Sequence, residues 1–146
     1  MWSNGYVLEG LLHKLAPLTA NCREFNEKWE AANHLDAAGA SGRWEGEWIS
    51  AVTGHRGPLK CVLIVLSPGL WRLLFRASYS GFFRACYAAD FTVGQEGGRW
   101  TFTGKQDLGT LAGGAYEYDG EATLAEMVCR YKSATDHGEF RLRRPQ

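Results

Sequence analysis

From Gly42 to the end of the chain, short segments of alternating apolar and polar residues are separated by glycine-rich breaks. Alternation with period two is typical of β-strands whose two faces meet different surroundings. Because the breaks are mostly of hairpin length, successive strands are expected to run antiparallel. Eight strands are predicted, at residues 43–53, 59–66, 70–78, 82–93, 99–105, 115–119, 123–132 and 139–143.

A run of short antiparallel strands must hide its edges, either in a sandwich or in a closed barrel. No helical crossover interrupts the eight segments, and the chain has 18 glycines and 13% aromatic residues, which favour strands joined by tight turns. We therefore predict a mainly β fold, an eight-stranded antiparallel up-and-down β-barrel over residues 41–146. Residues 1–40 are predicted to form an N-terminal helical arm.

The arm shows two helical patterns. Apolar residues at helical spacing run from Val7 to Leu15, and Pro17 should end that helix. A second helix is expected from about residue 21, with Phe25, Trp29 and Ala32 on one face. We interpret the arm as an extension packed on the barrel, with a partner-binding arm as the alternative.

Composition argues against several classes of partner. The 16 basic and 16 acidic residues cancel, so no nucleic-acid partner is expected. The longest apolar run, 61–66, is far too short to cross a membrane. The N-terminus does not follow the signal-peptide pattern, and the cytoplasm is slightly favoured over export, with the compartment left open. Homodimer formation is also left open.

The four cysteines show no C-x-x-C spacing, which argues against a zinc knuckle. We expect buried thiols, with one disulfide as the alternative if the protein is exported.

Strand alternation places many aromatic side chains inside the barrel. Buried tyrosine hydroxyls need hydrogen-bond partners, and several in one core are easier to accommodate around a cavity than in a solid interior. A solid core is the alternative. The residues predicted to line a ligand site are Trp48, Trp71, Phe75, Tyr87, Tyr116, Tyr118 and Tyr131.

Two histidines complete the predicted site. His55 follows the first strand and His137 precedes the last, so both loops fall at the same end of an up-and-down barrel. They are predicted to form a polar rim that selects a ligand, or alternatively an acid–base pair of an enzyme. No two histidines lie close enough in sequence to form a local metal pair, and no nucleophile elbow or phosphate loop occurs.

Gly42-Arg43-Trp44 resembles the G-x-W motif that opens the first strand of lipocalins and related calycin barrels. The resemblance covers about residues 42–144. It implies that Trp44 packs across a closed barrel end with an arginine, Arg141 or Arg143, against it. It also implies binding of a small, mostly hydrophobic molecule, with no catalysis required. The closing segment is similar to that of small bacterial barrel proteins of uncharacterised function.

The longer G-x-W-x-G, from Gly42 to Gly46, also resembles the opening of nitrobindin-type haem barrels. That resemblance would imply haem as a cofactor, with His137 as the candidate ligand. Our first prediction is a ligand-binding barrel with no cofactor. The enzyme and the haem barrel are the alternatives.

Overall fold

The computed structural model describes residues 22–32, 39–79, 83–107 and 114–145. The predicted helix between Val7 and Leu15 lies outside these residues. One helix is described, α3 (Cys22–Ala31), where the second helix of the arm was predicted. No described helix is long and apolar enough to cross a membrane.

Eight strands follow, one for each predicted segment. They are β1 (Gly42–Ser50), β2 (Arg56–Ser67), β3 (Leu70–Tyr79), β4 (Phe83–Glu96), β5 (Arg99–Asp107), β6 (Ala115–Ala122), β7 (Glu126–Lys132) and β8 (His137–Arg143).

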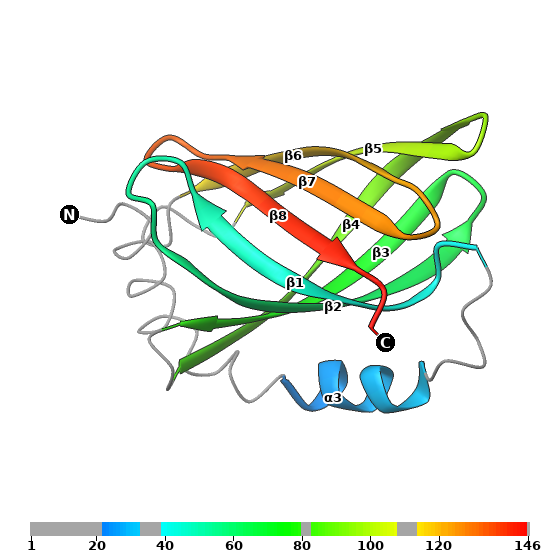
Figure 1. Ribbon diagram of the computed structural model, residues 1–146, viewed down its shortest axis with the longest axis horizontal. Coiled ribbons are helices and arrows are strands. Elements are labelled where there is room, and N and C mark those ends of the chain that lie inside the picture. Colours follow the sequence, from blue (N-terminus) through cyan, green and yellow to red (C-terminus); the bar gives the residue numbers. More distant parts are fainter. Residues whose placement is uncertain (1–21, 33–38, 80–82, 108–113, 146) are drawn as a thin grey trace.

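The strands form a closed barrel in chain order, and every neighbouring pair is antiparallel (Figure 1). The closing ladder joins β1 to β8, with Gly46 opposite Leu142 and Trp48 opposite Phe140. The predicted eight-stranded antiparallel barrel is therefore confirmed. Its two ends differ in composition, since Trp44 lies near one end and Tyr116 and Tyr131 lie near the other.

The barrel interior is apolar and rich in aromatic rings, as the alternation predicted. Trp44, Trp71, Phe75 and Phe91 are all buried from solvent almost completely. Ala125 falls within the predicted seventh strand, 123–132, but lies exposed in the turn before β7. The predicted seventh strand thus begins three residues too early.

One part of the barrel wall is incompletely paired. The β4–β5 ladder covers only Phe91–Glu96 of β4 and Arg99–Gly104 of β5. Residues 83–90 of β4 pair with β3 but have no partner in the described part of β5. The Gln106 side chain crosses this separation, donating from Nε2 to the Ala88 carbonyl oxygen at 2.6 Å.

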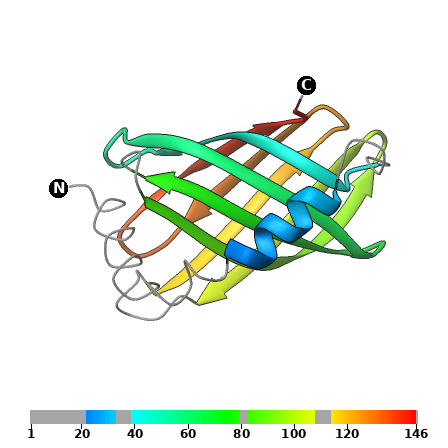
Figure 2. The same cartoon turned by 90° about the horizontal axis from the view of Figure 1, so that it is seen from below.

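Helix α3 lies on the outside of the barrel, across β2, β3 and β4 (Figure 2). Phe25 is buried there against Val62 and Leu74, which point outward from β2 and β3, and Trp29 and Ala32 pack on the same cluster. The predicted shared face of the helix is confirmed.

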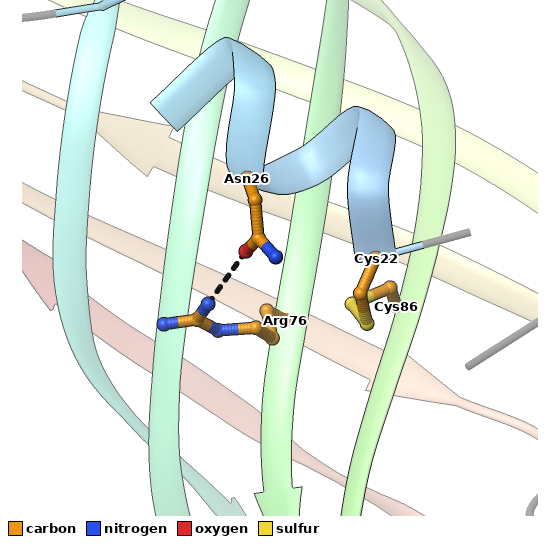
Figure 3. The surroundings of a disulfide bond; sticks show 4 residues. All are labelled: Cys22, Asn26, Arg76 and Cys86. Carbon is orange, nitrogen blue, oxygen red and sulfur yellow. Dashed lines mark hydrogen bonds between the residues drawn. A yellow bond between two sulfur atoms is a disulfide. The ribbon is translucent and has the colours of Figure 1, made fainter. Parts of the chain in front are cut away.

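A disulfide between Cys22 and Cys86 fastens the start of α3 to β4 (Figure 3). Beside it, Arg76 Nη1 donates to Asn26 Oδ1 at 2.7 Å. The expectation of four buried thiols is therefore wrong for this pair. Strand parity explains the pairing, because Cys86 faces out of the barrel toward the helix, whereas Cys61 and Cys129 remain buried free thiols inside.

Candidate functional site

The end of the barrel near Trp44 is closed by side chains. Trp44 is fully buried and donates from Nε1 to the Ala40 carbonyl oxygen at 2.9 Å. The guanidinium of Arg144 lies over the Trp44 ring, 4.2 Å from its centroid. We call this arrangement of Trp44, Arg144 and Ala40 the closed end.

The arginine at this position differs from the two predicted. Arg141 points outward and bonds to Glu139, and Arg143 is exposed. Both alternate with Phe140 and Leu142, so the next inward position in register is 144. The prediction stopped at the last strand residue and missed the arginine immediately beyond it.

Tyrosines gather at the opposite end, which we call the tyrosine end. Tyr116 and Tyr118 of β6 and Tyr131 of β7 lie inside the barrel and are almost completely buried. Tyr87 also faces the interior, from the part of β4 that pairs with β3 but not with β5. These four residues form the tyrosine cluster.

Ring contacts connect the tyrosine cluster through two phenylalanines. Tyr87 stacks on Phe75, with ring centroids 5.1 Å apart and planes 25° from parallel. Phe140 lies 5.3 Å from Phe75 and 5.2 Å from Tyr131, measured between centroids. The structure therefore brings five predicted site residues together. Phe140 lies in the predicted last strand, 139–143, but was not assigned to the site, although it contacts Phe75, Tyr118 and Tyr131.

Two of the tyrosine hydroxyls bond to polar groups of the barrel wall. Tyr118 donates to Gln106 Oε1 at 3.3 Å, the same amide that crosses the β4–β5 separation. Tyr131 donates to Asp136 Oδ2 at 3.1 Å. Tyr116 also has a hydrogen-bond partner, in Ser133. Sequence reasoning missed Gln106, whose inward position on β5 was the available signal.

Asp136 is a buried carboxyl group in the wall of this end. Its side chain accepts hydrogen bonds from the Ser50 hydroxyl at 3.0 Å and from Tyr131. Only 2% of the residue is exposed. Burial raises the pKa of the Asp136 carboxyl above its ordinary value, against the opposing effect of these hydrogen bonds.

Tyr87 differs from its three neighbours. No described residue forms a hydrogen bond with its hydroxyl, although the ring is packed on Phe75. It also retains partial exposure, unlike the other members of the tyrosine cluster. The inward positions beside it are small, since Ala85 and Ala89 flank it on β4 and Ala77 lies opposite Ala85 on β3.

Burial keeps the phenols protonated. It raises the pKa of Tyr116 to about 12, and it raises the pKa values of Tyr87 and Tyr118 still further from the ordinary phenol value. Nearby tyrosines add to the effect of burial at Tyr87. At physiological pH all three are neutral hydrogen-bonding groups.

The two predicted rim histidines do lie at one end. The Ser50 amide donates to the His55 carbonyl, and the neighbouring Ala51 amide donates to the His137 carbonyl, both at 2.9 Å. Both side chains are exposed, and His137 opens β8 on its outward face instead of lying in a loop. The structure therefore places them outside the tyrosine cluster.

The two predicted tryptophans lie in different parts of the barrel. Trp48 reaches the tyrosine end, where its Nε1 donates to the Ser78 carbonyl oxygen at 3.0 Å. The close approach of Gly57 permits this bond, because a Cβ there would lie 2.7 Å from the Trp48 nitrogen. Trp71 packs instead on Trp100 and Phe102, with centroids 5.8 and 5.7 Å away.

An outer groove of about 560 Å³ approaches the tyrosine cluster from outside. It crosses from β4 to β7 over Gly104 and reaches Tyr118. Charged residues border it, among them Asp90, Lys105 and Lys132. Within the described ranges, no group of three or more potential metal ligands occurs.

No family model matches the sequence, and no curated protein matches it. Among solved structures, the chain is similar to a variant of the fluorescent protein UnaG, with 9% sequence identity and a TM-score of 0.41. The similarity covers 73% of this chain and 96% of the other. The fold described above rests on the strand pairing itself.

Proposed function

We propose that this protein binds a small, mostly hydrophobic molecule inside the barrel, at the tyrosine end. The observation that carries the proposal is the position of Tyr87. Its side chain faces inward among apolar neighbours, yet it keeps exposed surface and a hydroxyl without a described hydrogen-bond partner. Barrels that bind small molecules combine apolar walls with a few such polar groups.

The small side chains around Tyr87 support the same proposal. Ala77, Ala85 and Ala89 are small inward-facing residues beside Tyr87, and in this proposal the ligand lies against the face of the Tyr87 ring that is turned away from Phe75. Aromatic walls favour such a ligand because they offer a large contact area at low cost in side-chain entropy.

The separation between β4 and β5 offers a route of entry. Only the Gln106 side chain crosses it among the described residues, and a side-chain bond exchanges faster than a strand ladder. Movement of Gln106 would break its bonds to Ala88 and Tyr118, which connects entry to the tyrosine cluster.

The lipocalin-like interpretation belongs to this proposal. Its support is the Gly42–Trp44 motif at the start of β1, together with a buried tryptophan covered by an arginine at the closed end. A ligand would then occupy the opposite end, which is where the tyrosine cluster lies. No catalytic step is needed for this function.

The two alternatives have less support. An acid–base enzyme would need an imidazole facing the cluster, and a haem barrel would need an inward histidine. His55 and His137 are both exposed, and the other two histidines lie outside the described residues.

The disulfide bears on the compartment. Disulfides persist in oxidising surroundings and are rare in the cytoplasm. The Cys22–Cys86 bond thus favours the exported alternative over the cytoplasmic one, and we propose export on this ground. Alkylation of freshly isolated, unreduced protein in denaturant, followed by mass measurement, tests the disulfide on which this proposal rests, because two alkylated cysteines support it and four contradict it.

Ligand binding is testable with the uncharged dye 1-anilinonaphthalene, whose fluorescence rises in apolar sites. The wild-type protein should bind it, and Ala85→Phe should weaken binding about tenfold or more by filling the space beside Tyr87. Ala88→Phe is the matched control, because residue 88 lies on the same strand and is exposed. Circular dichroism should show that both variants keep the fold.

Two results would contradict the proposal. The first is the absence of dye binding to wild type together with no co-purified small molecule in native mass spectrometry. The second is a folded Ala85→Phe variant that binds as tightly as wild type. Where phenylalanine prevents folding, Ala85→Val takes its place.

A further inference from the structure

We propose that the Tyr87 hydroxyl anchors the ligand, and that the ligand is an uncharged, flat aromatic molecule carrying a carbonyl or hydroxyl oxygen. This inference rests on the proposed function and names the chemical class that the tyrosine end selects. Three observations carry it, on the charge, the hydrogen bonding and the shape of the site.

The first observation is the lack of charge in the barrel wall. Within the described strands, no lysine, arginine, aspartate or glutamate occupies an inward position. The buried carboxyl near the tyrosine cluster is Asp136, which supplies no positive charge to an anionic ligand. An anionic ligand would lose its hydration without meeting a cation, and that cost is several kcal/mol or more. A carboxylate such as a fatty-acid head group is therefore disfavoured here.

Asp136 does not make the site one for cations. Its two carboxyl oxygens accept hydrogen bonds from Ser50 and Tyr131, respectively, which holds the group in the end wall. Its raised pKa also reduces its charge relative to an exposed aspartate as the pH falls. The remaining polar groups of the cluster are neutral phenols.

The second observation is the hydrogen-bonding state of the phenols. Tyr116, Tyr118 and Tyr131 are already bonded to the barrel wall. Tyr87 alone in the cluster has no such bond among the described residues. An unmet buried hydroxyl costs about 1–3 kcal/mol, so a ligand oxygen that bonds to Tyr87 recovers that free energy. A ligand without such an oxygen leaves the hydroxyl unmet.

The third observation is the geometry of the rings. Phe75 covers one face of Tyr87 in a stacked arrangement, with centroids 5.1 Å apart. Alanines flank the ring on β4, so its other face has no large neighbour on its own strand. A flat ring system bound against that face would extend the stack formed by Phe75 and Tyr87.

Two dyes that differ by one group test the charge selection. They are 1-anilinonaphthalene and 1-anilinonaphthalene-8-sulfonate, which share a ring system and differ in the sulfonate. The full-length wild-type protein should bind the sulfonate about tenfold more weakly or worse. The cation 1-naphthylmethylamine, used as a competitor at equal concentration, should not displace 1-anilinonaphthalene. Equal affinity for the sulfonate, or displacement by the amine, would overturn the neutral class.

The Tyr87→Phe variant tests the anchor, because it keeps the ring and removes the hydroxyl. The uncharged naphthyl ketone 6-propionyl-2-dimethylaminonaphthalene serves as probe, since hydrogen bonding to its carbonyl shifts its emission to longer wavelength. The variant should bind the ketone about tenfold more weakly and shift its bound emission to shorter wavelength. Its affinity for 1-anilinonaphthalene, which has no oxygen to accept a hydrogen bond from Tyr87, should fall less than its affinity for the ketone, and circular dichroism controls for the fold.

The outcomes separate this inference from the function on which it rests. Failure of both neutral dyes to bind wild type, together with no co-purified small molecule, would overturn the proposed function. Binding of both dyes with no effect of Tyr87→Phe on the ketone would overturn the anchor alone.

Discussion

Arg144 covers Trp44, with its guanidinium 4.2 Å from the centroid of the indole ring. The same guanidinium donates to the carbonyl oxygens of Ser41, Arg43 and Gly39. One side chain beyond the last strand thus secures the segment that leads into the first. Hydrogen bonds from charged donors contribute about 1.5–3 kcal/mol each, and a cation–π contact about 0.5–1 kcal/mol.

Replacing Arg144 by alanine should therefore lower the free energy of unfolding by about 2–4 kcal/mol, because these contributions overlap. Denaturation in urea measures this value. Arg141→Ala is the control, since Arg141 is exposed and its pairing with Glu139 should be worth less than about 1 kcal/mol. Equal losses in the two variants would show that the closed end does not depend on Arg144.

Breaking the disulfide should loosen α3 from the barrel. The bond joins residues 64 positions apart, and a closed loop of that length stabilises a folded chain by about 2–4 kcal/mol. The double variant Cys22→Ser, Cys86→Ser should lose stability by that amount, measured by denaturation under non-reducing conditions.

A reducing agent gives the matched control for the disulfide. It should lower the stability of wild type to that of the double variant and leave the double variant itself unchanged. If reduction has no effect on wild type, the packing of Phe25 and Trp29 alone holds the helix.

The stability of the barrel should depend on the ionisation of Asp136. Its pKa is raised in the folded state, so the folded protein binds the proton more tightly than the unfolded chain does. Stability contributed by this group therefore increases as the pH falls through the folded pKa. Asp136→Asn removes the titration and keeps the shape.

The unfolding free energy of wild type, relative to that of Asp136→Asn, should therefore increase as the pH is lowered from 7 toward 4. Comparing the two proteins at each pH cancels the other carboxyl groups. A difference that is constant with pH would exclude a raised pKa at Asp136.

The buried phenols should resist ionisation. With a pKa of about 12 at Tyr116, and higher values at Tyr87 and Tyr118, the folded protein should keep three phenols protonated at pH 11. Ultraviolet absorbance near 295 nm should rise in full only when alkaline unfolding exposes them. Tyr116→Phe should reduce only the absorbance change that accompanies alkaline unfolding. A smaller absorbance change near the ordinary phenol pKa in this variant would contradict the burial of Tyr116.

The fold could be predicted from sequence because its signals are local. Alternation indicated which side of a strand faces inward, and Trp71 and Phe75, both predicted to face the interior, are buried. Glycine-rich turns marked the hairpins. Cys86 faces outward by the same alternation, but its partner Cys22 lies 64 residues away, and nothing local indicates such a pairing.

The site could be predicted only in part, since it depends on how strands pair across the barrel. Sequence placed Tyr87, Tyr116, Tyr118 and Tyr131 inside. It could not show that three of them bond to the wall while Tyr87 does not, because those partners come from distant strands. Gln106 and Phe140 gain their importance from the same long-range contacts.

The β4–β5 ladder pairs only the second half of β4, so within the described strands the edge of residues 83–90 that faces β5 has no ladder partner. Backbone groups of residues 83–90 that face β5 lack ladder partners there, so the weakest line of the wall runs beside Tyr87. Local opening should start along this seam, and amide hydrogen exchange should be faster there than in the β1–β8 ladder. Ligand binding should then slow amide hydrogen exchange in residues 83–90 before it slows exchange in the other ladders, so these backbone amides would report on binding.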